Sequence, residues 1–251
     1  MMQADYSASE IRVLEDPEQV AREAAGLFVR LSVEAVSTRG AFSVALSGGS
    51  TPRRVYELLA GDDYRTQVSW PSVHVFFGDE RTVAPDHPDS NYRMANEALL
   101  SLVPIPAKNV HRMNGVGDAA ANASRYESEL RAFFGDAAWP RLDLVMLGMG
   151  DDGHTASLFP GSAALAERQA WVVANWVEKF QTWRITLTAP AVNAARRVLF
   201  LVTGAGKAER LREVLAGERD PSRLPSQLIQ PRDGTLEWFV DRAAAAKLEG
   251  E

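Results

Sequence analysis

Short apolar runs rich in β-branched and aromatic residues alternate with segments of helical period along this chain of 251 residues. Five such runs, at 41–46, 73–77, 142–147, 198–202 and 236–240, are predicted to be strands. A strand that is apolar at nearly every position must be covered on both faces, and intervening helices supply that cover. The alternation therefore predicts an α/β protein whose mostly parallel sheet carries helices on both faces.

The segments between these runs place apolar side chains at helical spacing. The predicted helices cover 52–60, 91–102, 119–134, 207–215 and 243–248. Two shorter candidates for strands lie at 171–176 and 183–187. No internal repeat, low-complexity tract or linker interrupts the pattern, so we expect residues 1–251 to form one domain.

Composition excludes several classes of partner and chemistry. A net charge of −6 argues against nucleic acid or an anionic membrane as partner, because both require a basic face. The chain has no cysteine, which excludes disulfides and thiolate catalysis and fits a reducing compartment. The first residues lack the pattern of a signal peptide, and no apolar run approaches the length of a membrane span. We therefore expect a cytoplasmic protein.

The predicted strand at 142–147 stops at a polar segment with catalytic potential. Two glycines, Gly148 and Gly150, permit a tight turn, and Asp152 and His154 follow within a few residues. A histidine held by a neighbouring carboxylate is suited to general-base chemistry near neutral pH. The alternative is an ordinary turn in which Asp caps a helix and His154 lies on the surface.

The predicted strand at 41–46 is followed by a segment suited to binding phosphate. Its residues are Ser47, Gly48, Gly49, Ser50, Thr51 and Pro52. Glycines expose backbone N–H groups, hydroxyls surround them, and the start of the next helix adds the positive end of a dipole. The segment matches neither the Walker A loop nor the dinucleotide G-x-G-x-x-G pattern. The alternative is a tight turn capped by Ser or Thr.

Further charged residues follow other predicted strands. Asp79 and Arg81, after the strand at 73–77, could orient substrate hydroxyls and supply a cation, or could form an internal ion pair in a solvated loop. Arg184 and Lys207 are isolated cations, and each could equally be an ordinary surface residue. Lys207 follows a strand and two glycines at the start of a helix, where an ammonium group can reach a bound anion.

Taken in order, these segments resemble the family of glucosamine-6-phosphate deaminases and 6-phosphogluconolactonases, and within it the 6-phosphogluconolactonases. The matching segments are 47–52, 79–81, 90–92, 150–160, 184–188, 206–208, 225–227 and 238–241. The resemblance implies a modified Rossmann-like fold and hydrolysis of 6-phospho-D-glucono-1,5-lactone to 6-phosphogluconate in the pentose phosphate pathway, with no metal and no cofactor. The expected partner is this small phosphorylated sugar lactone, and the oligomeric state stays open between a monomer and a small homo-oligomer.

The resemblance also suggests roles for the residues. His154 is expected to deprotonate water, Asp152 to orient the imidazole, and Arg81 or backbone N–H groups to stabilise the oxyanion. The phosphate is expected on residues 47–51, with Lys207 and Arg184 balancing its charge.

Two other functions remain open at this point: a sugar-phosphate isomerase or deaminase of the same fold, and a non-catalytic sugar-phosphate sensor. Deaminases resembling this family place Glu five positions after the histidine and usually Tyr at the position of Arg81. Here Phe159 occupies the first of these positions, which favours the lactonase. The presence of both His154 and Lys207 argues against the sensor.

Overall fold

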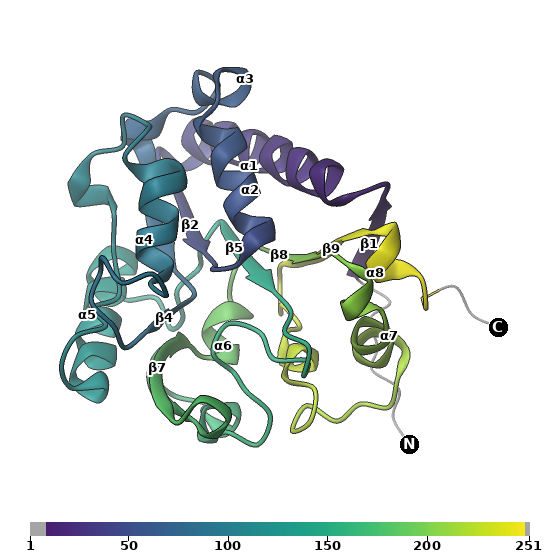
Figure 1. Ribbon diagram of the computed structural model, residues 1–251. Helices are drawn as coiled ribbons and strands as arrows, with labels where there is room; N and C mark the ends of the chain where they lie inside the picture. The colour runs from purple at the N-terminus through teal and green to yellow at the C-terminus, as the bar shows by residue number, and fades with distance from the viewer. Residues whose placement is uncertain (1–8, 249–251) are drawn as a thin grey trace.

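The computed structural model describes residues 9–248 and is built around a six-stranded parallel sheet (Figure 1). In spatial order its strands are β1 (Ser9–Leu14), β9 (Thr235–Asp241), β8 (Arg197–Val202), β5 (Leu144–Gly148), β2 (Phe42–Leu46) and β3 (Val73–Phe77). Every neighbouring pair is parallel. The prediction of a mostly parallel sheet is confirmed, and all five predicted strands are present with bounds shifted by no more than two residues.

Helices lie against both faces of this sheet. On one face are α1 (Pro17–Arg39), α2 (Ser50–Ala60) and α4 (Asn91–Ala95), with the short α3 (Asp62–Arg65) beyond α2. The opposite side carries α5 (Ala119–Phe134), α6 (Ala189–Val192) and α7 (Ala208–Ala216), and α8 (Arg242–Ala245) packs against α7 at the edge. The central strands are buried along their lengths because both faces are covered, as their continuous apolar sequences require.

The long helix α1 and the edge strand β1 were absent from the sequence prediction. Helix α1 is capped at its start by Asp16, whose side chain accepts a hydrogen bond from the N–H of Gln19, and at its end by Gly40, which has a left-handed φ of 81°. Its buried face contains four alanines, whose small side chains make the apolar periodicity of the sequence weak but allow close packing. Within residues 9–248, no helix combines the length and apolar character needed to cross a bilayer.

The two shorter strand candidates are real strands, but they lie outside the parallel sheet. They form β6 (Val172–Val177) and β7 (Thr182–Leu187), which pair antiparallel in a three-stranded sheet with β4 (Asp79–Arg81). This smaller sheet packs on α5. The helix predicted at 91–102 is also less regular than expected, because after α4 the chain widens into a π-type turn at Asn96–Leu100.

The order of the strands determines where a ligand can bind. The chain passes from β2 to β3 on one side and later returns to place β5 on the other side of β2. Loops that follow β2 and β5 therefore diverge and leave a crevice at the carboxyl ends of these two strands. Open parallel sheets bind ligands at such a reversal of strand order.

A histidine pair at the edge of the sheet should make stability depend on pH. His74 Nδ1 lies 3.2 Å from His111 Nε2, and His111 Nδ1 lies 2.7 Å from a Glu129 oxygen. Burial, together with the charges of His111 and Lys108, lowers the pKa of His74 below its ordinary value of 6.5. The unfolded chain therefore takes up this proton at a higher pH than the folded protein, so acidification below 6.5 favours unfolding.

We expect the free energy of unfolding to fall less on acidification in His74→Gln than in the unaltered protein. Glutamine keeps a polar side chain but cannot titrate, so the contribution of His74 is lost. Denaturant unfolding at about pH 7.5 and about pH 5.5, on either side of the ordinary histidine range, measures the difference. Equal losses in the two proteins would exclude His74 as a source of the pH dependence.

Candidate active site

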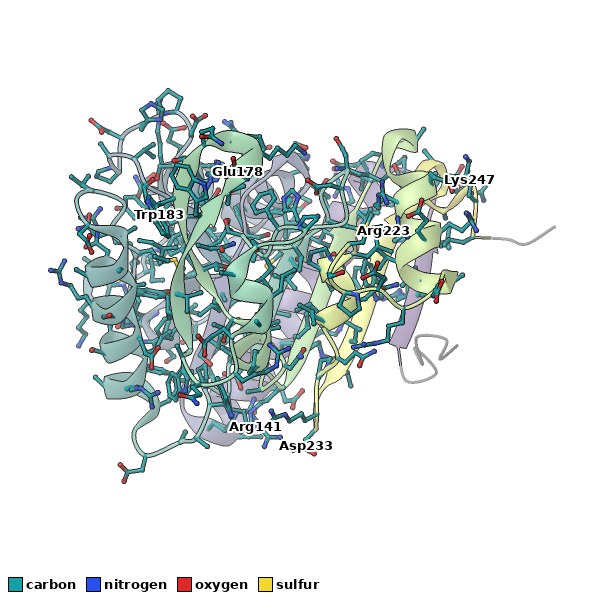
Figure 2. The ribbon with its side chains drawn as sticks, turned by 90° about the horizontal axis from the view of Figure 1, so that it is seen from below. Arg141, Glu178, Trp183, Arg223, Asp233 and Lys247 are labelled. Atoms are coloured by element: carbon teal, nitrogen blue, oxygen red, sulfur yellow. The ribbon has the colours of Figure 1, made fainter. Side chains whose placement is uncertain are left out.

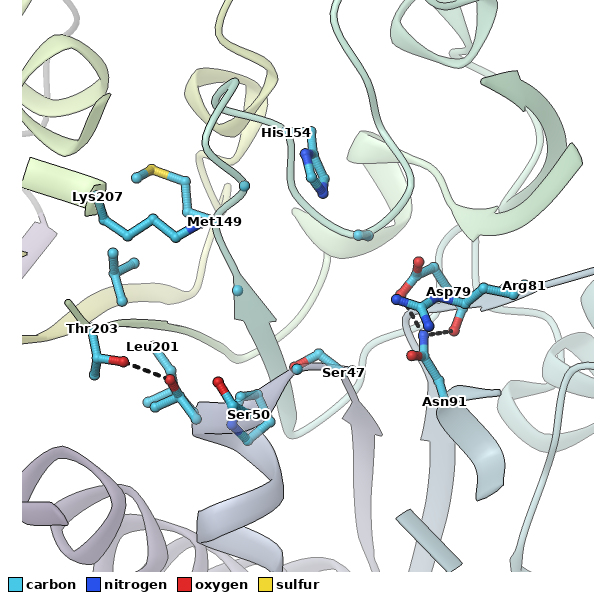
Figure 3. Close-up of a pocket in the computed structure, with 18 residues that line it drawn as sticks. Ser47, Ser50, Asp79, Arg81, Asn91, Met149, His154, Leu201, Thr203 and Lys207 are labelled. Carbon is cyan, nitrogen blue, oxygen red and sulfur yellow. Dashed lines mark hydrogen bonds between the residues drawn. The ribbon is translucent and has the colours of Figure 1, made fainter. Parts of the chain in front are cut away.

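A cavity of about 320 Å³ opens at the carboxyl ends of β2 and β5, at the reversal of strand order (Figure 3). Its walls consist of residues 47–52, Asp79, Arg81, Asn91, residues 148–150, His154, Ala156, residues 201–203 and Lys207. Most of the residues singled out from the sequence thus meet here, although they come from four separate stretches of chain.

The segment after β2 forms a polar wall of this cavity. Gly49 has φ 110° and ψ 164°, a conformation essentially restricted to glycine, and no side chain caps the N-terminus of α2 that it precedes. The first N–H groups of α2 therefore remain available to a ligand. Ser47 Oγ is buried without a hydrogen-bond partner in the described part of the chain. These features suit a cradle for an anion.

Tyr56 holds this cradle in shape from inside the protein. Its hydroxyl accepts a hydrogen bond of 3.0 Å from the N–H of Ser47 and donates one of 2.9 Å to the carbonyl of the same residue. Burial raises the pKa of Tyr56 far above its ordinary value, so the hydroxyl stays protonated and can make both bonds.

Lys207 lies on the same side of the cavity as Ser50 (Figure 3). Its ammonium group is paired with Asp151, and this hydrogen bond lowers the pKa of the Asp151 carboxyl. Close by, the hydroxyls of Thr51 and Thr203 form a hydrogen bond of 2.7 Å. A cation, a helix N-terminus and several hydroxyls therefore surround one end of the cavity.

His154 lies at another wall and is held by Asp152. Its Nδ1 is 2.5 Å from Asp152 Oδ1, which leaves Nε2 without a partner among residues 9–248. Burial opposes ionisation of Asp152, but hydrogen bonds from His154 and Lys179 outweigh it and hold the pKa of this carboxyl far below its usual range. No helix begins at Asp152, so the alternative of a helix-capping aspartate is wrong.

Two further contacts fix the orientation of this imidazole. The Phe159 ring stacks on it with centroids 4.0 Å apart and 22° between the planes. Gly150 also packs against the ring, and a Cβ atom there would lie 2.0 Å from His154 Nδ1 and 2.1 Å from its Cε1. Only glycine at position 150 leaves room for the ring in this position.

Asp79 and Glu80 are buried, and their hydrogen bonds fix the wall of the cavity that contains Asp79 and Asn91. Asp79 accepts hydrogen bonds from Ser157 Oγ at 2.6 Å and Asn91 Nδ2 at 3.1 Å. Glu80 accepts hydrogen bonds from the N–H groups of Asn91 and Tyr92, both at 2.8 Å, and so anchors the start of α4. Burial raises the pKa of Glu80, and these hydrogen bonds oppose the rise.

Two arginines lie side by side beyond these carboxylates. Arg81 lines the cavity and donates to the carbonyl of Asp89, and it pairs across the β4–β7 ladder with Arg184. Burial, with the charge of Arg81, lowers the pKa of Arg184. Arg184 does not line the cavity, and neither does Asp152, which acts on it through His154.

Sequence reasoning missed several residues of this site. Thr203 and Met149 line the cavity but were given no role, although they lie in segments that the sequence singles out, and Lys179 binds Asp152 from a distant strand pair. Asn91 could be found only as part of the family pattern. Within residues 9–248, no group of three or more His, Asp or Glu side chains converges in a way that could hold a metal ion.

The fold and the cavity are those of an α/β protein that binds its ligand at a reversal of strand order. The family model described as glucosamine-6-phosphate isomerases/6-phosphogluconolactonase matches residues 15–238. The chain belongs to this family.

Individual relatives agree with this assignment. The 6-phosphogluconolactonase of Nostoc sp. is 43% identical over 95% of this chain and 98% of its own length. That of Synechocystis sp. is 45% identical over 86% of this chain and 88% of its own. A solved structure of 6-phosphogluconolactonase from Trypanosoma cruzi superposes with a TM-score of 0.85 at 31% identity, over 96% of this chain and 97% of the other.

The close approach of Gly150 to His154 predicts the effect of adding one methyl group. In Gly150→Ala the new Cβ must displace the imidazole, so kcat for the reaction proposed below should fall by about ten- to a hundredfold. The matched control is Gly26→Ala in α1, where the nearest atom is the flexible end of Arg30 at 3.4 Å. Steady-state kinetics and thermal unfolding of both variants test this, and full activity in Gly150→Ala would contradict it.

Proposed function

We propose that this protein hydrolyses 6-phospho-D-glucono-1,5-lactone to 6-phosphogluconate. The single observation that carries the proposal is the Asp152–His154 pair, whose free Nε2 lies in the same cavity as the polar loop 47–51 and Lys207. One end of this cavity can hold a phosphate while the other presents a general base to the lactone ring. Two relatives named 6-phosphogluconolactonase, each more than 40% identical, support the same substrate.

In the proposed mechanism, His154 acts as the general base. Its Nε2 accepts a proton from water as the water oxygen bonds to the lactone carbonyl carbon. Asp152, ionised because of its low pKa, stabilises the resulting imidazolium. The tetrahedral intermediate then expels the ring oxygen, which takes the proton back from His154, and the product is an open-chain carboxylic acid that ionises in water.

We assign Arg81 to stabilisation of the oxyanion of that intermediate, because it is a cation that lines the same cavity as His154. Lys207 and the N-terminus of α2 hold the phosphate, and on binding the phosphate replaces Asp151 as the partner of Lys207. Arg184 adds positive charge behind Arg81. Asp79, fixed by Ser157 and Asn91, orients the substrate hydroxyls.

The deaminase alternative finds no support at this site. Its ring-opening carboxylate would stand at position 159, but Phe159 stacks there on His154 and makes that environment apolar.

The role of His154 is tested by direct assay of lactone hydrolysis, corrected for the spontaneous background. We expect His154→Ala to lower kcat by roughly 10²–10⁴-fold, the usual contribution of a positioned general base. Thermal unfolding shows whether the variant is folded. Near-normal turnover in a folded His154→Ala protein would remove the histidine from the mechanism, and no acceleration by the unaltered protein would refute the proposed function.

The role of Lys207 is tested by comparing two substrates. Loss of a charge-assisted contact costs about 1.5–3 kcal/mol, so Lys207→Ala should raise KM for the phosphorylated lactone by about tenfold or more. Hydrolysis of unphosphorylated gluconolactone should hardly change, since that substrate never makes the contact. Lys247→Ala is the matched control, because Lys247 pairs with Glu209 on the surface. Equal losses on both substrates would show that Lys207 does not recognise phosphate.

A further inference from the structure

The turn between β6 and β7 reaches back to the catalytic pair from a different sheet. Figure 2 shows Glu178 and Trp183 at this end of the hairpin, far from Arg141 and Asp233, which lie near the amino ends of β5 and β9. At the turn, Lys179 Nζ lies 2.9 Å from Asp152 Oδ2, the oxygen opposite the one that binds His154. The carboxylate of Asp152 is thus shared between the imidazole and an ammonium group.

The next residue of the turn supports the other neighbour of the imidazole. Phe180 meets the Phe159 ring edge-on, with centroids 5.7 Å apart and 86° between the planes. Phe159 in turn stacks on His154. Two consecutive residues of one turn therefore hold the two groups that flank His154, one through charge and the other through an aromatic contact.

The turn itself is built to keep this geometry. Gln181 adopts the left-handed conformation with φ 49°, and its side-chain amide donates hydrogen bonds to the carbonyl and to the carboxylate of Glu178, at 3.0 and 2.8 Å. The Trp176 indole N–H donates to the other Glu178 oxygen at 2.8 Å. These bonds close the turn on itself, so Lys179 and Phe180 are presented together.

We propose that Lys179 and Phe180 are positioning residues for the reaction: they hold the Asp152–His154 pair in place, and Lys179 keeps His154 in its neutral, basic form. The proposal rests on the general-base role proposed above for His154. A cation on the shared carboxylate disfavours a second positive charge on the imidazole. It also keeps Asp152 ionised, in agreement with the low pKa of that carboxyl.

Other charges near His154 come from three directions. Asp151 and Asp152 belong to its own loop, Lys207 and Arg210 come from the start of α7, and Arg81 faces it across the cavity. Arg184 lies over the Phe180 ring, 5.6 Å from its centroid. Among these groups Lys179 and His154 alone share a carboxylate, so removal of Lys179 changes the charge balance of the pair most directly.

The test is the pH profile of kcat/KM for the phosphorylated lactone. In Lys179→Ala, the Asp152 carboxylate interacts with the imidazole alone, which favours the imidazolium. The acid limb of the kcat/KM profile should therefore move to higher pH by about 0.5–1 unit. In Lys179→Arg the acid limb should lie at the same pH as in the unaltered protein, because arginine keeps the positive charge. Phe180→Ala should lower kcat by roughly three- to tenfold without moving the limb, since it loosens the ring without changing charge. Lys108→Ala, which removes a cation elsewhere, should leave the profile unchanged.

A second measurement does not depend on catalysis. The NMR signals of the His154 ring, followed in the free protein from low to high pH, should change at a higher pH in Lys179→Ala than in the unaltered protein or Lys179→Arg. An unmoved titration and an unmoved acid limb in folded Lys179→Ala would overturn the inference. A shifted titration in a protein that hydrolyses no lactone would show that Lys179 acts on the charge of His154 and would refute the proposed function.

Discussion

The pairing of β2 with β5 is the constraint on which the rest of this structure depends. Val44 lies beside Leu144 and Ala45 beside Val145, in parallel and buried on both faces. Because the two strands run in the same direction, their carboxyl ends lie side by side. The loops that follow them must therefore start at the same edge of the sheet. The glycine-rich loop and the turn that carries His154 meet there for this reason, although about a hundred residues separate them.

The carboxylates on the two sides of the cavity have different roles. Glu80 and Asp79 accept hydrogen bonds from backbone and side-chain donors. These bonds fix the wall of the cavity and offset the negative charge of the two carboxylates. Asp152 is instead shared by a histidine and a lysine. Although the net charge of the protein is −6, Arg81, Arg184 and Lys207 lie around one cavity. There the three cations can attract a phosphorylated substrate.

The two sheets divide the site between them. The parallel sheet supplies the polar loop 47–51, the Asp152–His154 pair and Lys207 at the ends of β2, β5 and β8. The smaller antiparallel sheet supplies Arg81 and Arg184 from paired strands, and the Lys179–Phe180 turn that contacts Asp152 and Phe159. Under the proposed mechanism, a change in the β6–β7 hairpin alters the chemistry at His154 without touching the substrate.

The sequence by itself determined the features that depend on neighbours along the chain. The five apolar strands, the glycine-rich loop and the closeness of Asp152 to His154 are local, because strand burial and tight turns depend on a few consecutive residues. Helix α1 escaped prediction since alanine gives little contrast between its faces. Only the tertiary structure decided that β6 and β7 leave the main sheet and that Lys179 binds a carboxylate 27 residues earlier. Such contacts depend on how the two sheets pack against each other, and the pattern of neighbouring residues in the sequence does not specify that packing.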